Sequence, residues 1–181
     1  MGEANDLFDP CADGDPQEPA RPAADRQARV QHALDLAYRH LGRRDRTVAE
    51  VRRHLETKRI EPAEIDAAVA ELSRQGYLDD ARYARRVTED RRTLDGWGVK
   101  RIERRLVTAG VDPATAAEAL ADRGPGDELE AAVSVLRRRL AVPPADDRAR
   151  ERALAHLVRR GYALDLAYDA VRAFEREAAT A

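Results

Sequence analysis

The sequence predicts an all-α protein, an elongated array of three tandem three-helix repeats with about nine helices, preceded by a disordered N-terminal tail. From Asp25 onward the apolar residues recur at helical spacing, and Leu, Ala, Arg and Glu dominate. Isoleucine occurs only at positions 60, 65 and 102, and no alternating run of β-branched residues predicts a strand. A set of apolar positions also recurs 51 residues later, which indicates an internal repeat.

The N-terminal segment, positions 1–25, has the composition of an acidic tail. It contains seven carboxylates, one arginine and four prolines, a net charge of −6. Such a segment buries too little apolar surface to offset the entropy lost on ordering, so we expect it to be disordered. The whole chain has a formal net charge of −2, so the remainder carries +4, mostly as arginine. Arginine suits contacts with phosphate or carboxylate groups, although ordinary helix surfaces also carry both signs of charge.

The first repeat is expected over residues 26–76. Its leading helix, about 26–42, has Val30, Leu34 and Leu41 on one stripe and ends at Gly42. Thr47-Val-Ala-Glu50 has the form of a capping box, which predicts that a second helix begins there. Glu61-Pro62 predicts the start of the third helix, because proline at the first helical position loses no hydrogen bond.

The second and third repeats are expected over residues 77–124 and 125–181, with leading helices at about 79–94 and 127–141. Asp112-Pro113 predicts another helix start in the second repeat. Gly110 and Gly161 occupy matching positions, where a left-handed residue is expected to end a helix. The recurring apolar positions are Val51, Leu55, Ile60, Ile65 and Val69; Ile102, Leu106, Val111, Ala116 and Leu120; and Ala153, Leu157, Tyr162, Ala167 and Val171.

The stretch GYLDDARYARRV, residues 76–87, is interpreted as the joint between the first two repeats. Asp79 and Asp80 stand where a helix is expected to begin, and aspartate there caps free amides at the positive end of the helix dipole. A catalytic acid pair would instead share a cleft, and residues adjacent in sequence do not share a helical face. We interpret Tyr77, Leu78, Tyr83 and Ala84 as packing between the two repeats.

The order TVAEVRRHL, GYLDDARYA and GVKRIERRLVTAGV resembles the RecX family, regulatory proteins of the RecA recombinase. The resemblance covers about residues 28–175, and the acidic tail and the Asp95-Gly-Trp-Gly98 turn depart from it. It implies tandem three-helix repeats and a non-catalytic protein of DNA repair, DNA recombination and the SOS response. It implies binding to the RecA filament on single-stranded DNA, with inhibition of ATP hydrolysis, filament growth and strand exchange. The single cysteine, Cys11, can form no disulfide framework, so a reducing cytoplasm is the expected compartment.

The densest positive segment lies between residues 82 and 105 and carries a net charge of +5. It is the candidate surface for the recombinase filament, with single-stranded DNA as a further candidate ligand. The alternative is a solvated helix face with pairs such as Arg86 with Asp90. The candidate binding residues are Arg82, Arg85, Arg86, Arg92, Lys100, Arg101, Arg104 and Arg105, and second-rank candidates are Arg137, Arg138, Arg139, Arg159 and Arg160.

The sequence lacks the motifs that are typical of several classes of enzyme and of metal or phosphate site. The four histidines form no HExxH pattern, neither serine lies in a GxSxG setting, and Gly96-Trp-Gly98 begins no phosphate loop. We therefore expect no enzyme, no cofactor and no metal, and the one tryptophan, Trp97, is expected to pack in a turn rather than stack on bases. No apolar run predicts a membrane span, and a monomer is expected. The rival hypothesis is a helical-repeat adaptor for another acidic protein, with no role in DNA repair.

Overall fold

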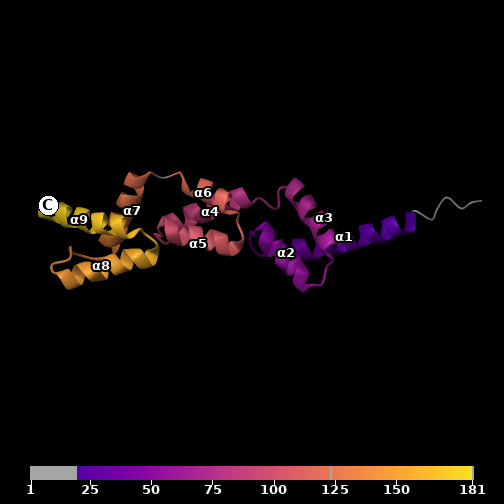
Figure 1. The fold of residues 1–181 in the computed structure, drawn as a ribbon, viewed down its shortest axis with the longest axis horizontal. Coiled ribbons are helices and arrows are strands. Elements are labelled where there is room, and N and C mark those ends of the chain that lie inside the picture. The colour runs from indigo at the N-terminus through magenta and orange to yellow at the C-terminus, as the bar shows by residue number, and fades with distance from the viewer. Residues whose placement is uncertain (1–19, 123, 181) are drawn as a thin grey trace, which may run out of the picture.

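The computed structural model describes residues 20–122 and 124–180, and this part of the chain forms nine α-helices and no strand. The helices follow one another as an elongated array (Figure 1). Their bounds are α1 Ala20–Leu41, α2 Val48–Thr57, α3 Pro62–Arg74, α4 Asp80–Thr93, α5 Val99–Ala109, α6 Pro113–Leu120, α7 Pro125–Arg139, α8 Asp147–Arg160 and α9 Leu164–Thr180. The predicted all-α repeat class is confirmed for the described residues.

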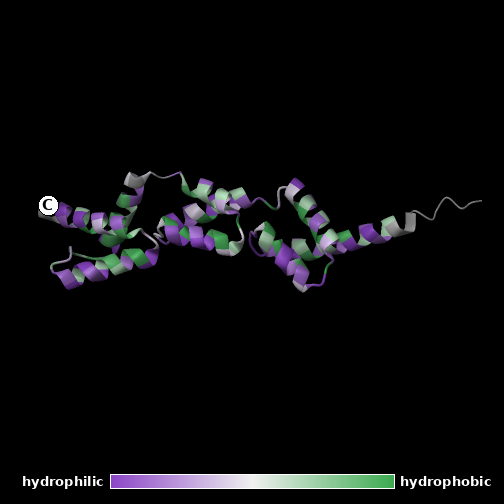
Figure 2. Ribbon diagram, in the orientation of Figure 1, coloured by the Kyte–Doolittle hydropathy of each residue, from purple (hydrophilic) through white to green (hydrophobic). Residues whose placement is uncertain are grey.

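Three separate apolar cores lie along the array, one for each successive group of three helices. The first includes Leu55 and Leu72, the second Ile102 and Leu106, and the third Leu136. All five side chains are fully buried. Hydrophobic and hydrophilic residues alternate around the helices, as expected when each helix buries one stripe (Figure 2). The boundaries predicted at 76/77 and 124/125 remain a prediction.

The local signals at the helix ends act as predicted. Thr47 and Glu50 form the capping box of α2, with the Thr47 hydroxyl accepting from the Glu50 amide at 3.1 Å. Proline occupies the start of α3 and α6, and the Asp112 carboxylate accepts from two amides of α6. Gly110 and Gly161 end α5 and α8 with φ of 87° and 95°, in the left-handed region.

Two expectations about the first repeat require correction. Helix α1 begins at Ala20, before the predicted start at residue 26. Proline at position 22 does not prevent this, because the first four residues of a helix donate no intrahelical backbone hydrogen bond. The rest of the predicted tail, residues 1–19, lies outside the described residues. Leu78 packs in the first core and Tyr77 makes an edge contact with Tyr38, whereas Tyr83 and Ala84 pack in the second core. The predicted packing seam is therefore divided between the two cores.

Candidate binding surface

The middle helices of the repeats meet end to end. In Figure 1, α8, α5 and α2 follow one another along the lower side of the molecule. At each of the two joints, the C-terminus of one helix abuts the N-terminus of the middle helix of the preceding repeat. The end of α5 meets the start of α2, and the end of α8 meets the start of α5. Because helix dipoles add head to tail, this arrangement places opposite partial charges in contact.

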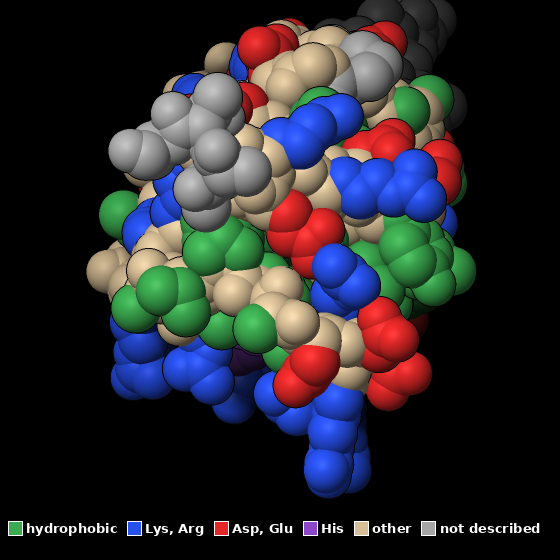
Figure 3. Space-filling model, turned by 90° about the vertical axis from the view of Figure 1, so that its left-hand side faces the viewer, with side chains coloured by type: hydrophobic (Ala, Val, Ile, Leu, Met, Phe, Trp, Pro, Cys, Tyr) green, Lys and Arg blue, Asp and Glu red, His purple; other side chains and the backbone are tan. Residues whose placement is uncertain are grey.

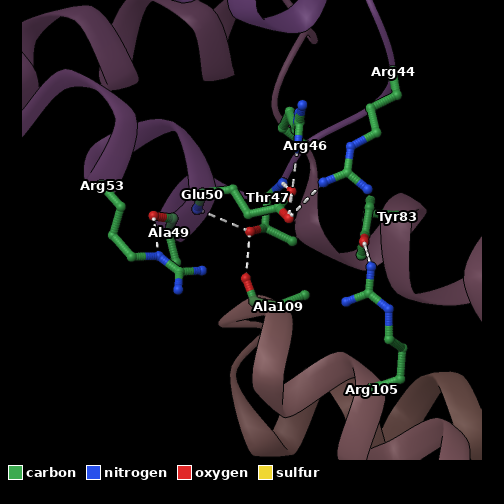
Figure 4. A network of polar contacts seen from close by, with 9 residues as sticks. All are labelled: Arg44, Arg46, Thr47, Ala49, Glu50, Arg53, Tyr83, Arg105 and Ala109. Atoms are coloured by element: carbon green, nitrogen blue, oxygen red, sulfur yellow. Dashed lines mark hydrogen bonds and ion pairs between the residues drawn. The ribbon is translucent and has the colours of Figure 1, made fainter. Parts of the chain in front are cut away.

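The joint between α2 and α5 depends on Thr47, which is fully buried. Its hydroxyl donates to the carbonyl oxygen of Ala109 at 2.6 Å while it accepts from the Glu50 amide (Figure 4). Gly110 follows directly, and a Cβ atom there would collide with the Cβ of Ala49. The single Thr47 hydroxyl therefore caps the start of α2 and also binds the end of α5 through a hydrogen bond.

The joint between α5 and α8 repeats this arrangement at the next repeat boundary with backbone groups. The Gly98 amide donates to the Arg160 carbonyl at 2.9 Å, and the Lys100 amide donates to the Gly161 carbonyl at 3.1 Å. A Cβ atom at Gly161 would lie 2.5 Å from the Arg101 nitrogen. Two glycines thus allow the two helix ends to approach closely.

Asp79 and Asp80 cap two different helices. The Asp79 carboxylate accepts from the Arg82 amide of its own helix at 2.8 Å, which confirms the predicted cap. The Asp80 carboxylate accepts from the Val48 amide at 3.0 Å, at the start of α2 in the preceding repeat. Burial raises the pKa of Asp80, and the hydrogen bond from Val48 partly opposes that rise. The interpretation of this pair as a structural joint explains both carboxylates.

The structure separates the eight candidate binding residues by their surroundings. Five of them have side-chain contacts within the chain. Arg82 donates to the Gly76 carbonyl, Arg86 pairs with Asp45 in the loop between α1 and α2, and Arg92 donates to the Leu120 carbonyl at the end of α6. Arg101 donates to the Arg159 carbonyl and Arg105 donates to the Tyr83 hydroxyl. In the alternative of a solvated helix face, Arg86 would pair with Asp90, but in the structure it pairs across the joint with Asp45.

The remaining three, Arg85, Lys100 and Arg104, are exposed, and their side chains form no hydrogen bond or ion pair among the described residues. They extend from α4 and α5, the two helices that carry the densest positive charge. Side chains that stabilise no part of the fold are available for a partner. These three are therefore the most direct candidates for contact among the eight.

Sequence reasoning missed the surroundings of Trp97. Its ring is half-buried against the second core, as expected for a packed turn. The guanidinium of Arg101 lies 4.0 Å from the ring centroid, and that of Arg91 lies 5.1 Å from it. Trp97 therefore positions two arginines. One feature of the sequence could have indicated a position at a joint. Trp97 lies just before a predicted helix start, and the internal repeat aligns it with Arg46.

The imidazoles of His40 in α1 and His54 in α2 stack at a centroid distance of 3.9 Å. Burial lowers the pKa of both rings, and nearby positive charge lowers each further.

None of the helices in the described part of the chain combines the length and the apolar composition that a membrane-spanning helix needs.

Comparison with known proteins agrees with this architecture. The model of the RecX first three-helix domain matches residues 33–72, and that of the second three-helix domain matches residues 79–120. The regulatory protein RecX of Leptothrix cholodnii is 34% identical over 141 residues, which span 78% of this chain and 88% of that protein. The chain belongs to the RecX family. Its RecX relative from Trichlorobacter lovleyi is 39% identical over 72% of this chain and 87% of that protein.

Solved RecX structures share the fold. RecX from Lactobacillus salivarius superimposes with a TM-score of 0.72 at 19% identity, over 83% of this chain and 99% of that chain. A second RecX crystal structure superimposes with a TM-score of 0.68 at 18% identity, over 96% of this chain and 81% of that chain. The two relatives at 34% and 39% identity confirm the family resemblance predicted from the sequence, and their names make this a family of regulatory proteins.

Proposed function

We propose that this chain binds the RecA recombinase filament on single-stranded DNA and inhibits ATP hydrolysis, filament growth and strand exchange. The observation that carries the proposal is membership of the RecX family, at 34% and 39% identity to two regulatory proteins over most of their length. The protein acts in the cytoplasm as a monomer, by binding and without catalysis of its own.

The shape of the molecule supports this proposal. Its three cores are arranged in line, and hydrogen bonds fasten α2 to α5 and α5 to α8. An extended array of stacked repeats offers a long surface, which suits contact with several neighbouring subunits of a filament. Arg85, Lys100 and Arg104 lie on the central repeat and supply positive charge that the fold does not require.

Cosedimentation with recombinase filaments assembled on single-stranded DNA tests the proposal and its residues separately. The variant Arg85→Glu/Lys100→Glu/Arg104→Glu reverses three exposed charges, and we expect it to bind the filament at least about tenfold more weakly than the native chain. The matched control Lys58→Glu/Arg148→Glu/Arg172→Glu makes the same charge change at three exposed positions, which lie at the end of α2, in α8 and in α9, respectively. It should bind like the native chain.

Each outcome has a distinct meaning. A native chain that stays in the supernatant with filaments present would contradict filament binding. If the triple variant cosediments as well as the native chain, filament binding stands as the proposed function, but Arg85, Lys100 and Arg104 are excluded as contact residues. If the triple variant and the control bind the filament equally weakly, the loss of binding results from the change in net charge and not from the positions of these residues.

A further inference from the structure

The first half of α1 has little apolar support from the rest of the described fold. Helix α1 extends beyond the start of α3, so its first turns project as a single helix (Figure 1). Residues 23–29 are all exposed, and Val30 is only half-buried. A short helical segment without packing is marginal in water, because most helix stability in proteins comes from the burial of one face. The start of α1 is therefore a surface that a covering segment would stabilise.

A hollow of about 820 Å³ lies between α1 and α3 and begins at this unsupported half. The two helices run in the same direction. Arg29 bonds to Glu64 near the start of α3, and Tyr38 bonds to Gln75 at its end. We call this hollow the α1–α3 groove. Half of its lining residues are apolar, and these are Ala23, Val30, Leu34, Tyr38, Ala67 and Ala70.

The charged lining of the α1–α3 groove suits an acidic segment. Arg26 is exposed and forms no hydrogen bond or ion pair among the described residues. The one carboxylate in the lining, that of Glu71, already pairs with Arg74. With two arginines and one carboxylate, the lining is net positive. The remaining lining residues are the neutral Gln27, Gln31 and Gln75.

We infer that the α1–α3 groove holds the acidic N-terminal segment of the same chain, residues 1–19, with Leu7 and Phe8 as its apolar anchors. The segment has six carboxylates and no lysine or arginine, which complements the positive lining. Apart from Met1, these two anchors are its only large apolar side chains. Such a segment has too little apolar surface to fold by itself, and the groove supplies a surface on which it orders. The contact goes beyond the proposed function, because the segment lies outside the family resemblance.

The covalent connection allows this contact within one chain. The groove extends from Ala23 to Tyr38, which is roughly 22 Å along the helix. Phe8 precedes Ala20 by 12 positions, which span up to roughly 40 Å when extended. The connection contains Gly14 and three prolines, residue types that favour turns. After the chain turns back, the anchors can therefore reach every part of the groove.

Another large hollow lies out of reach of these anchors. It has a volume of about 760 Å³ and lies between α7 and α8. It belongs to the end of the molecule that faces the viewer in Figure 3, where hydrophobic side chains are exposed among charged ones. Helices α1, α5 and α8 follow one another along the array, and their lengths add up to roughly 70 Å. The connection thus favours the α1–α3 groove for a segment of the same chain.

A disulfide-formation experiment tests the inference, because the single cysteine, Cys11, lies three residues after Phe8. Gln31→Cys places a second thiol in the groove, and His32→Cys places one at an exposed position of α1 outside its lining. In an oxidised glutathione buffer, the intramolecular disulfide should form at least about tenfold faster in Gln31→Cys, since adjacent helical positions point about 100° apart. Adding Leu7→Ser/Phe8→Ser should abolish this difference, which controls for unequal thiol reactivity.

Hydrogen exchange at the start of α1 gives an independent measurement with no added cysteine. Leu7→Ser/Phe8→Ser should speed the exchange of the amides of residues 27–31 at least about threefold, because the covering segment is released. The control Leu94→Ser/Val142→Ser removes two exposed apolar side chains far from the groove. It should leave the exchange of these amides unchanged.

Three results would overturn the inference: equal disulfide rates in Gln31→Cys and His32→Cys, a difference that survives Leu7→Ser/Phe8→Ser, or native exchange rates in the serine variant. A disulfide that joins two chains, seen on a non-reducing gel, would instead assign the segment to the groove of a second copy. Both experiments omit the recombinase, so their failure leaves filament binding unaffected.

Discussion

A left-handed residue ends the middle helix of every repeat, at equivalent positions of the three repeats. These residues are Arg59, with φ of 60°, Gly110 and Gly161. Glycine is required at the latter two because the start of a preceding helix lies against them, at Ala49 and Arg101. Arg59 is exposed, so its side chain has room, but its backbone remains in a conformation that costs about 1–2 kcal/mol for a residue with a Cβ atom.

Replacement of these residues should have opposite effects on stability. Arg59→Gly should raise the free energy of unfolding by about 0.5–1 kcal/mol, because relief of strain exceeds the extra entropy of glycine in the unfolded chain. Gly110→Ala should lower it by about 2–3 kcal/mol, since the new methyl group collides with Ala49 and the left-handed conformation becomes strained. Urea denaturation measures both changes. A destabilised Arg59→Gly or a neutral Gly110→Ala would contradict this account of the joints.

At the scale of elements, the start of α2 is both a helix cap and a joint. Thr47→Val keeps the shape of the side chain but leaves the Glu50 amide and the Ala109 carbonyl without their partner. We expect a loss of about 2–3 kcal/mol, whereas Thr47→Ser should lose less than about 1 kcal/mol because the hydroxyl remains. Chemical denaturation gives the loss, and faster hydrogen exchange of the Glu50 amide in Thr47→Val would locate it. Equal stability of the two variants would show that the hydroxyl does not hold the joint.

The packing of α1 against α2 should weaken in mild acid. The pKa values of His40 and His54 lie below the ordinary value of 6.5, through burial first and then through positive neighbours that include Arg46. A histidine with a lowered folded pKa contributes full stability above its unfolded pKa. That stability is lost as pH falls below about 6.5 toward the folded value.

The unfolding free energy should therefore decrease between about pH 7 and about pH 5, and His54→Gln should make this decrease smaller. His32→Gln is the control, because His32 is an exposed residue of α1 outside the stack. Denaturation across this pH range measures the effect. An identical pH dependence in the native chain and His54→Gln would exclude a contribution from the stack.

At the scale of the whole molecule, the repeat architecture could be predicted because its signals are local or periodic. The capping box at Thr47, the Asp112-Pro113 start and the constant offset between repeats each depend on spacing alone. The contacts between repeats could not be predicted in this way. Asp80 caps a helix of the preceding repeat, and Arg86 pairs with Asp45, 41 residues away, because stacking brings distant surfaces together.

The same limit applies to the candidate surface. Residue spacing placed the arginines of α4 and α5 away from the cores, but it did not show that Arg92 and Arg101 are engaged at the edges of the second repeat. It also could not bring Arg101 next to Arg159, because 58 residues separate them.

The most direct test of the central claim is the rate of DNA-dependent ATP hydrolysis by the RecA recombinase of the same organism as this protein is added. A filament regulator should inhibit hydrolysis at or below one molecule per recombinase subunit, and the Arg85→Glu/Lys100→Glu/Arg104→Glu variant should require a higher concentration. An unchanged rate with a folded, helical protein in excess would contradict the claim.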